Sequence, residues 1–202
     1  HLGGVILLKW EGNIQTRNQL IALTGSMQNL DTVPLFIAID QEGGHIARLT
    51  EENGFSETVS AQYLGELDDT VQTGRWSEVI AQDLYDAGIN INLAPVVDLN
   101  INPESPAIGK WERSFSENPD KVVKHASVYI KEHHKKGIFC TLKHFPGHGS
   151  ATDDSHLGFT DISNTWIEDE LEPYFQLINA GLCDFIMTAH VFNANLDAEY
   201  PA

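Results

Sequence analysis

The chain has 202 residues, of which 42% are hydrophobic, and its 12 Lys and Arg against 29 Asp and Glu give a formal net charge of −17. That apolar fraction excludes a disordered chain, and the length suits one sizeable core better than two domains. The negative field repels phosphate backbones, so we expect no nucleic-acid partner. Because uninterrupted apolar runs of about 18 residues do not occur, the sequence predicts no membrane span.

The two cysteines and the two ends of the sequence give weaker indications. Cys140 and Cys183 lie in apolar runs, which predicts buried free thiols and no disulfide. A signal peptide is not visible in these residues, and we expect a cytoplasmic location. The chain reaches strand-like sequence soon after His1 and stops at Ala202 without a closing element. We therefore expect a fragment of a longer protein.

Five short, near-continuously apolar runs predict strands that are buried on both faces of a parallel sheet. The runs are 4–8 (GVILL), 35–40 (LFIAID), 91–98 (INLAPVVD), 139–144 (FCTLKH) and 185–190 (FIMTAH). Helical sequence separates them, so the order alternates between strand and helix from the first run to the last. This alternation predicts an α/β protein with a parallel sheet.

Apolar stripes and capping signals predict four helices, over 14–30, 71–88, 118–137 and from 165 onward. The third has Asn118 as a candidate N-cap with Pro119 in the first helical position. The fourth opens with Thr165 and Glu168 at capping-box spacing. Pro173 then breaks this fourth helix and restarts a helical turn.

Polar residues at the ends of the predicted strands distinguish between two architectures. In a (β/α)8 barrel they converge on one face, whereas in a doubly wound sheet they spread along an edge. A Gly-rich nucleotide-binding motif does not follow the first strand, so we favour the barrel. Since a TIM barrel needs about 250 residues, we expect about five βα units of an incomplete one. The polar strand ends are Lys9, Asp40 to Glu42, Asp98, Lys143 with His144, and His190.

The segment 143–156 (KHFPGHGSATDDSH) packs three His, two Asp and one Lys into a loop after a strand. Three interpretations of this segment compete. In the first it is a mobile catalytic loop in which Asp154 and His156 form a proton-transfer pair. In the second it is a metal site of His144, His148 and His156, and in the third a polar surface loop. The histidine spacings match no common zinc signature, so we expect no metal. The position directly after a buried strand disfavours a plain surface loop.

Other charged residues allow several roles when they are taken alone. Three roles are open for Asp40 and Glu42: an acid/base pair, binding of sugar hydroxyls, or support of the double-glycine turn that follows them. Arg48 and Arg113 suit surface or structural ion pairs. On the third helix, we expect solvent-exposed histidines at His125, His133 and His134.

Taken together, these segments resemble glycoside hydrolase family 3, and within it the β-N-acetylhexosaminidase branch. The matches occur in order and cover nearly the whole chain, and KHFPGHG followed shortly by DSH is highly specific. The residues that carry the resemblance are IDQEGG (39–44), Arg48 with Leu49, INLAPVVDLN (91–100), RSF (113–115), KHFPGHG (143–149), DSH (154–156) and MTAH (187–190).

The resemblance implies hydrolysis of terminal β-linked N-acetylglucosamine, with retention of configuration through a covalent glycosyl-enzyme. It implies peptidoglycan-derived sugars as substrates and no cofactor. The implied general acid/base is His156, oriented by Asp154. The implied sugar-binding residues are Asp40, Arg48, Arg113, Lys143 and His144.

The sequence departs from the family pattern in two places and leaves two alternatives open. His45 stands where the family often has Arg, and the family's nucleophile, an Asp in a later strand-end motif, is expected beyond Ala202. The first barrel strand is likewise expected upstream, so residues 1–202 form one partial catalytic barrel domain. The alternatives are a β-glucosidase-like member, which the DSH loop argues against, and a catalytically silent sugar-binding protein. Hydrolysis and phosphorolysis are not distinguished, and the oligomeric state stays open.

Overall fold

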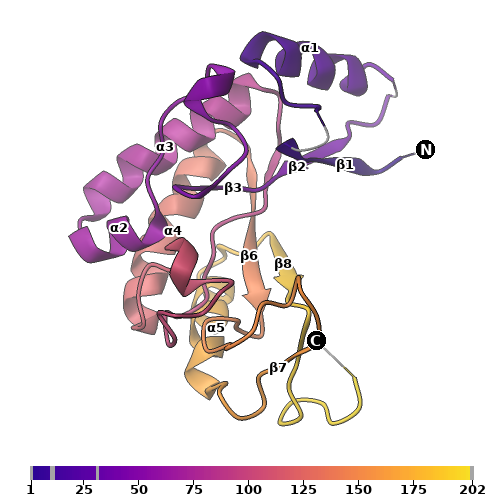
Figure 1. Ribbon diagram of the computed structural model, residues 1–202. Coiled ribbons are helices and arrows are strands. Elements are labelled where there is room, and N and C mark those ends of the chain that lie inside the picture. The colour runs from indigo at the N-terminus through magenta and orange to yellow at the C-terminus, as the bar shows by residue number, and fades with distance from the viewer. Residues whose placement is uncertain (1, 10–11, 31, 201–202) are drawn as a thin grey trace.

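The computed structural model describes residues 2–9, 12–30 and 32–200 (Figure 1). Its main sheet has five strands in the order β1-β2-β5-β6-β8, and each neighbouring pair is parallel. Neighbours in the sheet are thus neighbours along the chain, without the reversal of strand order that defines a doubly wound sheet. The strands are β1 (Gly4–Leu7), β2 (Phe36–Ile39), β5 (Ile91–Asn92), β6 (Phe139–Phe145) and β8 (Phe185–Thr188).

Helices connect the strands, and Figure 1 shows α2, α3 and α4 together on one side of the sheet. α3 and α4 pack directly against each other, and α5 packs on α4. The helices are α1 (Arg17–Gln28), α2 (Ala61–Leu67), α3 (Thr70–Asp86), α4 (Pro119–Lys135) and α5 (Glu172–Asn179). In the described part of the chain, none of them is long and apolar enough to cross a membrane.

Within the described residues, two small two-stranded sheets and several 3-10 helices lie outside the main sheet. β3 (Gln41–Gly43) and β4 (Ile46–Ala47) form an antiparallel hairpin directly after β2, and β7 (Thr160–Asp161) pairs in parallel with β9 (Val191–Phe192). The 3-10 helices are η2 (Glu51–Asn53), η3 (Gly109–Trp111) and η4 (Glu168–Leu171).

The sheet is curled, as the contacts of three phenylalanines demonstrate. Phe36, Phe139 and Phe185 begin β2, β6 and β8, and their rings meet edge-to-face at centroid distances of 5.9–6.3 Å. In a flat sheet, β2 and β8 would lie about 14 Å apart, since they are three strand spacings away from each other. Their contact therefore requires curvature, with these side chains on the concave face, as in the wall of a barrel.

The predicted strands 4–8, 35–40, 139–144 and 185–190 are confirmed to within one or two residues, but the run 91–98 is shorter than expected. Regular pairing of β5 ends at Asn92. Pro95 has no N–H to donate to a ladder. The chain nevertheless continues beside β6, because Val96 forms an isolated bridge with Lys143.

The first three predicted helices are confirmed. In α4, the Asn118 side chain accepts a hydrogen bond from the N–H of Lys121 at 3.1 Å, with Pro119 in the first turn. The structure adds α2, a short helix that the sequence analysis did not predict. Its cap is Ser60, whose hydroxyl oxygen accepts from the N–H of Tyr63 at 3.2 Å.

The capping box expected at Thr165 and Glu168 is wrong. η4 begins at Glu168 without a side-chain cap, and the Thr165 hydroxyl donates to the carbonyl of Ile162 at 3.4 Å. The predicted interruption and restart at Pro173 is confirmed, because η4 ends at Leu171 and Pro173 lies in the first turn of α5. The N–H that proline lacks has no intrahelical partner at that position.

The exposure predicted for the α4 histidines is wrong for His125 and His133, which are fully buried. They lie on the same helical stripe as Val122 and Tyr129, which faces the core. Burial lowers the pKa of His133 to about 4. His134 points outward and its Nε2 lies 2.7 Å from Asp184. The free thiols are confirmed, although Cys140 is buried and Cys183 only partly so.

Two helical glycines give a matched test of this packing. A Cβ on Gly65 of α2 would lie 1.7 Å from the carbonyl oxygen of Phe115, whereas one on Gly25 of α1 would meet nothing within 4 Å. Gly65→Ala should lower the free energy of unfolding by about 1–3 kcal/mol through overpacking. Gly25→Ala should raise it by up to about 1 kcal/mol through helix propensity. Urea denaturation of the full-length protein measures both, and equal stabilities would contradict the described packing of α2.

Candidate active site

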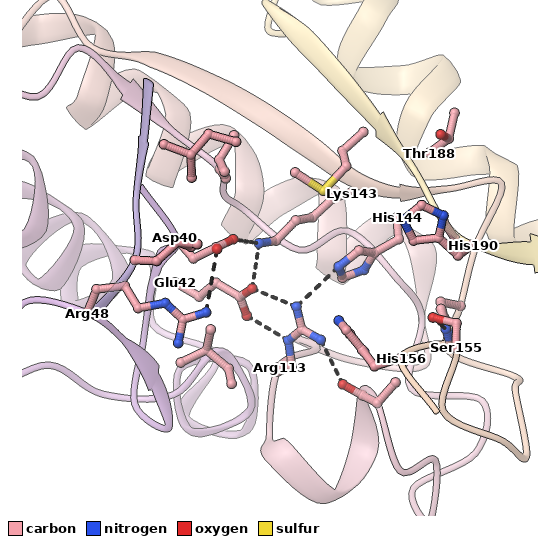
Figure 2. Close-up of a pocket in the computed structure, with 18 residues that line it drawn as sticks. Asp40, Glu42, Arg48, Arg113, Lys143, His144, Ser155, His156, Thr188 and His190 are labelled. Atoms are coloured by element: carbon pink, nitrogen blue, oxygen red, sulfur yellow. Dashed lines mark hydrogen bonds and ion pairs between the residues drawn. The ribbon is translucent and has the colours of Figure 1, made fainter. Parts of the chain in front are cut away.

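A cavity of about 410 Å³ lies where the carboxyl ends of the curled strands converge (Figure 2). Its polar lining comes from segments far apart along the chain, as expected for a barrel whose strands all point to one face. The titratable lining residues are Asp40, Glu42, Arg48, Arg113, Lys143, His144, His148, His156 and His190.

A buried cluster of charges forms the floor of this cavity. Lys143 is 1% exposed, and its Nζ lies 2.9 Å from Oδ1 of Asp40 and 2.6 Å from Oε1 of Glu42. Arg113 binds the same Glu42 with two groups: Nη2 donates to Oε1 at 2.7 Å and Nε to Oε2 at 2.8 Å. Glu42 therefore joins β6 to the loop that carries Arg113.

Glu42 is ionised in this setting. Burial raises its pKa, but the charges and hydrogen bonds of Lys143 and Arg113 outweigh burial and bring the pKa from 4.5 to about 2. For Arg113, burial lowers the pKa, and the attraction of Glu42 more than reverses that effect. A buried carboxylate between two cations is stable only with such close geometry.

The Gln41 side chain sets the position of Arg48. Its Oε1 accepts from the backbone N–H groups of Arg48 and Leu49 at 2.8 and 2.9 Å, and its Nε2 donates to the carbonyl of Leu49 at 3.0 Å. The backbone carbonyl of Gln41 is held as well: it accepts from Nδ2 of Asn92 at 3.0 Å and from the Tyr129 hydroxyl at 2.9 Å. The Arg48 guanidinium then reaches Oδ2 of Asp40, with Nη2 at 3.5 Å.

A second buried carboxylate, Asp98, holds the strand end that carries His144. It accepts from the backbone N–H of His144 at 3.1 Å and from that of His148 at 2.9 Å, and it lies 2.7 Å from Nδ1 of His144. Arg113 donates to Nε2 of His144 at 3.2 Å. Since arginine cannot accept, Nε2 carries a lone pair and the ring proton lies on Nδ1.

The electrostatics agree with a neutral His144. Burial lowers its pKa, and the attraction of Asp98 offsets that effect only in part. Burial raises the pKa of Asp98, but the interactions with His144 and His148 outweigh it and the pKa is lowered. Asp98 thus stays ionised and fixes the ring orientation of His144.

The Asp154–His156 pair expected from the sequence is present as a contact. Oδ1 of Asp154 lies 2.7 Å from Nδ1 of His156 and accepts from the backbone N–H of His156 at 2.9 Å. Burial raises the pKa of Asp154, but these two hydrogen bonds prevail and the pKa is lowered. The His156 side chain is 75% exposed and lines the cavity. Its catalytic role stays a prediction.

The structure brings most of the predicted residues together. Six of them line the cavity, namely Asp40, Arg48, Arg113, Lys143, His144 and His156, and Asp154 holds His156. Lys9 lies elsewhere, with its Nζ 3.3 Å from the Thr50 hydroxyl. His45 packs edge-on against Trp111 and lies 3.8 Å from Glu112.

Some site residues were not assigned from the sequence. For Glu42 the sequence leaves an acid/base, a sugar-binding and a structural role open, and its alternation with Asp40 past a strand end is the signal that indicates it. Asp98 ends a predicted strand, which is a similar signal. No sequence signal indicated that His148 contacts Ser155, with Nε2 and Oγ 3.0 Å apart. Among the described residues, groups of three or more His, Cys, Asp or Glu suited to a metal ion are not found.

Comparison with known proteins identifies the family. Residues 1–202 match the family model described as the glycosyl hydrolase family 3 N-terminal domain. The chain belongs to glycosyl hydrolase family 3. It is 38% identical over 213 residues to beta-hexosaminidase A of Pseudoalteromonas piscicida, covering 100% of this chain and 33% of that protein. It is 39% identical over 203 residues to a beta-hexosaminidase of Tolumonas auensis, covering 97% and 58%.

Solved structures of the family show the same fold. A glycoside hydrolase family 3 β-N-acetylglucosaminidase from Paenibacillus sp. FPU-7 superposes with a TM-score of 0.89 at 32% identity, covering 98% of this chain and 38% of that one. NagZ from Neisseria gonorrhoeae in complex with N-trifluoroacetyl-D-glucosamine gives 0.86 at 33% identity, covering 96% and 58%. The chain thus spans between one third and three fifths of the length of these relatives. The prediction of a partial (β/α)8 barrel is confirmed.

The buried charge cluster makes stability depend on acidic pH in a specific way. Because the folded state lowers the pKa of Glu42 from 4.5 to about 2, its contribution is complete above pH 4.5 and is lost as the pH falls toward 2. A shift of that size corresponds to about 3 kcal/mol. Glu42→Gln should therefore be less stable than wild type near pH 7, and the difference should narrow across this window.

The measurement is the free energy of unfolding by chemical denaturation at several pH values. Glu112→Gln serves as the control, because its carboxylate is about half exposed and should leave stability within about 0.5 kcal/mol of wild type. A difference between wild type and Glu42→Gln that stays constant from pH 7 to 3 would contradict the ion-pair assignment.

Proposed function

We propose that the protein hydrolyses terminal β-linked N-acetylglucosamine with retention of configuration. The observation that supports this most strongly is the cavity itself, in which the exposed His156, paired with Asp154, faces fixed groups suited to sugar hydroxyls. Relatives that cover the whole chain are named beta-hexosaminidases. The activity, substrate and partners of the full-length protein belong to this proposal.

The floor of the cavity supplies the groups that a sugar needs. Asp40 offers carboxylate oxygens to hydroxyl donors, while Lys143, Arg48 and Arg113 donate to hydroxyl oxygens. Their mutual ion pairs hold these side chains in place before a ligand arrives. Preorganised groups of this kind lower the entropy lost when a ligand binds.

His156 is suited to act as the general acid/base. With Nδ1 engaged by Asp154, its Nε2 is left to give a proton to the leaving-group oxygen and to take one from water in the second step. A retaining glycosidase also needs a carboxylate nucleophile. An imidazole in place of the usual second carboxylic acid lowers the negative charge that this nucleophile meets.

Neither carboxylate on the cavity floor is proposed as that nucleophile. Asp40 and Glu42 are both ion-paired with Lys143, and Glu42 also with Arg113. Ion pairing with these cations stabilises both carboxylates and makes them weaker nucleophiles. We expect the nucleophile to be an Asp from outside residues 1–202, as the family resemblance implies.

The finer substrate that we propose is N-acetylglucosamine linked to muropeptide sugars from peptidoglycan, hydrolysed in the cytoplasm. The support for this substrate is the resemblance to the β-N-acetylhexosaminidase branch. One solved relative is described in complex with N-trifluoroacetyl-D-glucosamine, which supports an N-acylated sugar in this site.

Two chromogenic substrates separate the candidate functions. The full-length protein should release the aryl group from an aryl β-N-acetylglucosaminide much faster than from an aryl β-glucoside. Preference for the glucoside would indicate a β-glucosidase-like member instead. Binding of N-acetylglucosamine without turnover of either substrate would indicate a silent sugar-binding protein.

Replacing His156 tests its assigned role. His156→Ala should lower kcat/KM for a substrate with a poor leaving group by about 10²–10⁴, the usual contribution of general acid–base catalysis. A 2,4-dinitrophenyl glycoside needs little protonic assistance and should be affected far less in kcat/KM. His134→Ala is the control, because His134 lies on α4 and pairs with Asp184. A loss below tenfold on the poor substrate would remove His156 from this role.

A further inference from the structure

One hydrogen bond ties the acid/base loop to the cavity floor. Nε2 of His148 lies 3.0 Å from Oγ of Ser155, which stands between Asp154 and His156 in the sequence. Neither His148 nor Ser155 has a task in the proposed reaction. Both line the cavity, however, and Figure 2 shows Ser155 beside His156.

His148 is itself firmly held. It is 2% exposed, and its backbone N–H donates to Oδ1 of Asp98 at 2.9 Å. The next residue, Gly149, donates its N–H to Oε2 of the buried Glu170 at 3.1 Å. The ring of His148 also meets that of His144 edge-on, at 6.1 Å between centroids. His148 therefore moves with the buried floor of the cavity.

Residues 152–158 are held much more loosely. Their other hydrogen bonds in the described structure close within the segment, such as the Leu157 N–H to the Asp154 carbonyl and the Asp154 contacts of His156. Leu157 projects into solvent and is 88% exposed. Across the described residues, the His148–Ser155 contact is thus the one hydrogen bond that connects this segment to the rest of the protein.

We propose that His148 and Ser155 are positioning residues that hold residues 152–158 so that His156 faces the cavity. The inference rests on the proposed function, since it assigns His156 the proton transfer. The Asp154–His156 pair would survive the loss of this contact, because both of its members lie in the segment. Loss of the contact would instead shift the Asp154–His156 pair relative to the bound sugar. A misplacement of about 1 Å can lower the rate of the catalysed reaction about 10²-fold.

The experiment compares leaving groups in the full-length protein. Ser155→Ala should lower kcat/KM about 10–100-fold for an alkyl β-N-acetylglucosaminide, whose departure needs a proton. For the 2,4-dinitrophenyl glycoside, kcat/KM should change less than about threefold, because its first step needs no acid. Ser155→Thr keeps the hydroxyl and should restore most of the activity. Thr152→Val removes a hydroxyl whose one hydrogen bond in the described structure is to Asp153, and this variant should behave as wild type.

A double mutant checks that the two residues act through each other. His148→Gln should show the same leaving-group dependence as Ser155→Ala, and adding Ser155→Ala to it should cost less than about threefold more. Thermal melting by circular dichroism identifies any unfolding of the buried His148 variant. Ser155→Ala, Ser155→Thr and Thr152→Val replace exposed or partly exposed residues and carry the test if that variant unfolds.

The possible results separate the two claims. Equal losses on both substrates, additive effects of the two substitutions, or wild-type rates for Ser155→Ala would overturn the positioning role and leave the proposed function standing. A wild-type enzyme that hydrolyses neither N-acetylglucosaminide would overturn the proposed function and the positioning role with it.

Discussion

The site depends on one buried carboxylate, Glu42, that is shared by Lys143 and Arg113. Removing one partner from a buried ion pair leaves an uncompensated charge, which typically destabilises a protein by about 3–5 kcal/mol. The cluster therefore holds Lys143 and Arg113 in fixed positions, although their side chains come from β6 and from a distant loop. The curl of the sheet makes this possible, because it brings the ends of β2 and β6 to one concave face. The curvature of the sheet thus determines the distances between the charged side chains of the site.

Around this cluster the polar side chains divide into a rigid floor and a loosely held loop. Gln41 and Asp98 are both buried, and each accepts hydrogen bonds from two backbone N–H groups: those of Arg48 and Leu49 for Gln41, and those of His144 and His148 for Asp98. Buried hydrogen-bond networks of this kind rigidify their surroundings. In the described structure, the segment that carries His156 has no comparable support beyond the contact of Ser155 with His148. The proposed proton donor thus lies on a less firmly held segment than the groups proposed to bind the sugar.

The strands, the first three helices and the convergence of charged side chains could be predicted from the sequence, because apolar periodicity and strand-end polarity are local signals. What escaped prediction depends on tertiary structure. In the sequence, Glu42 cannot be distinguished in role from Asp40, and only the tertiary structure shows its ion pairs with Lys143 and Arg113. His125 and His133 are polar residue types, and only the packing of α4 on α3 shows that they are buried. The contact of His148 with Ser155 joins two turns of one irregular loop, for which no periodic pattern exists.

Whether this cavity belongs to a retaining glycosidase, as we propose, is decided by the stereochemistry of the product. Proton NMR of an aryl β-N-acetylglucosaminide during hydrolysis by the full-length protein reports which anomer appears first. We predict that β-N-acetylglucosamine accumulates before mutarotation, because two displacements restore the configuration. Initial release of the α anomer would contradict it, since inversion needs a base that activates water and no covalent intermediate.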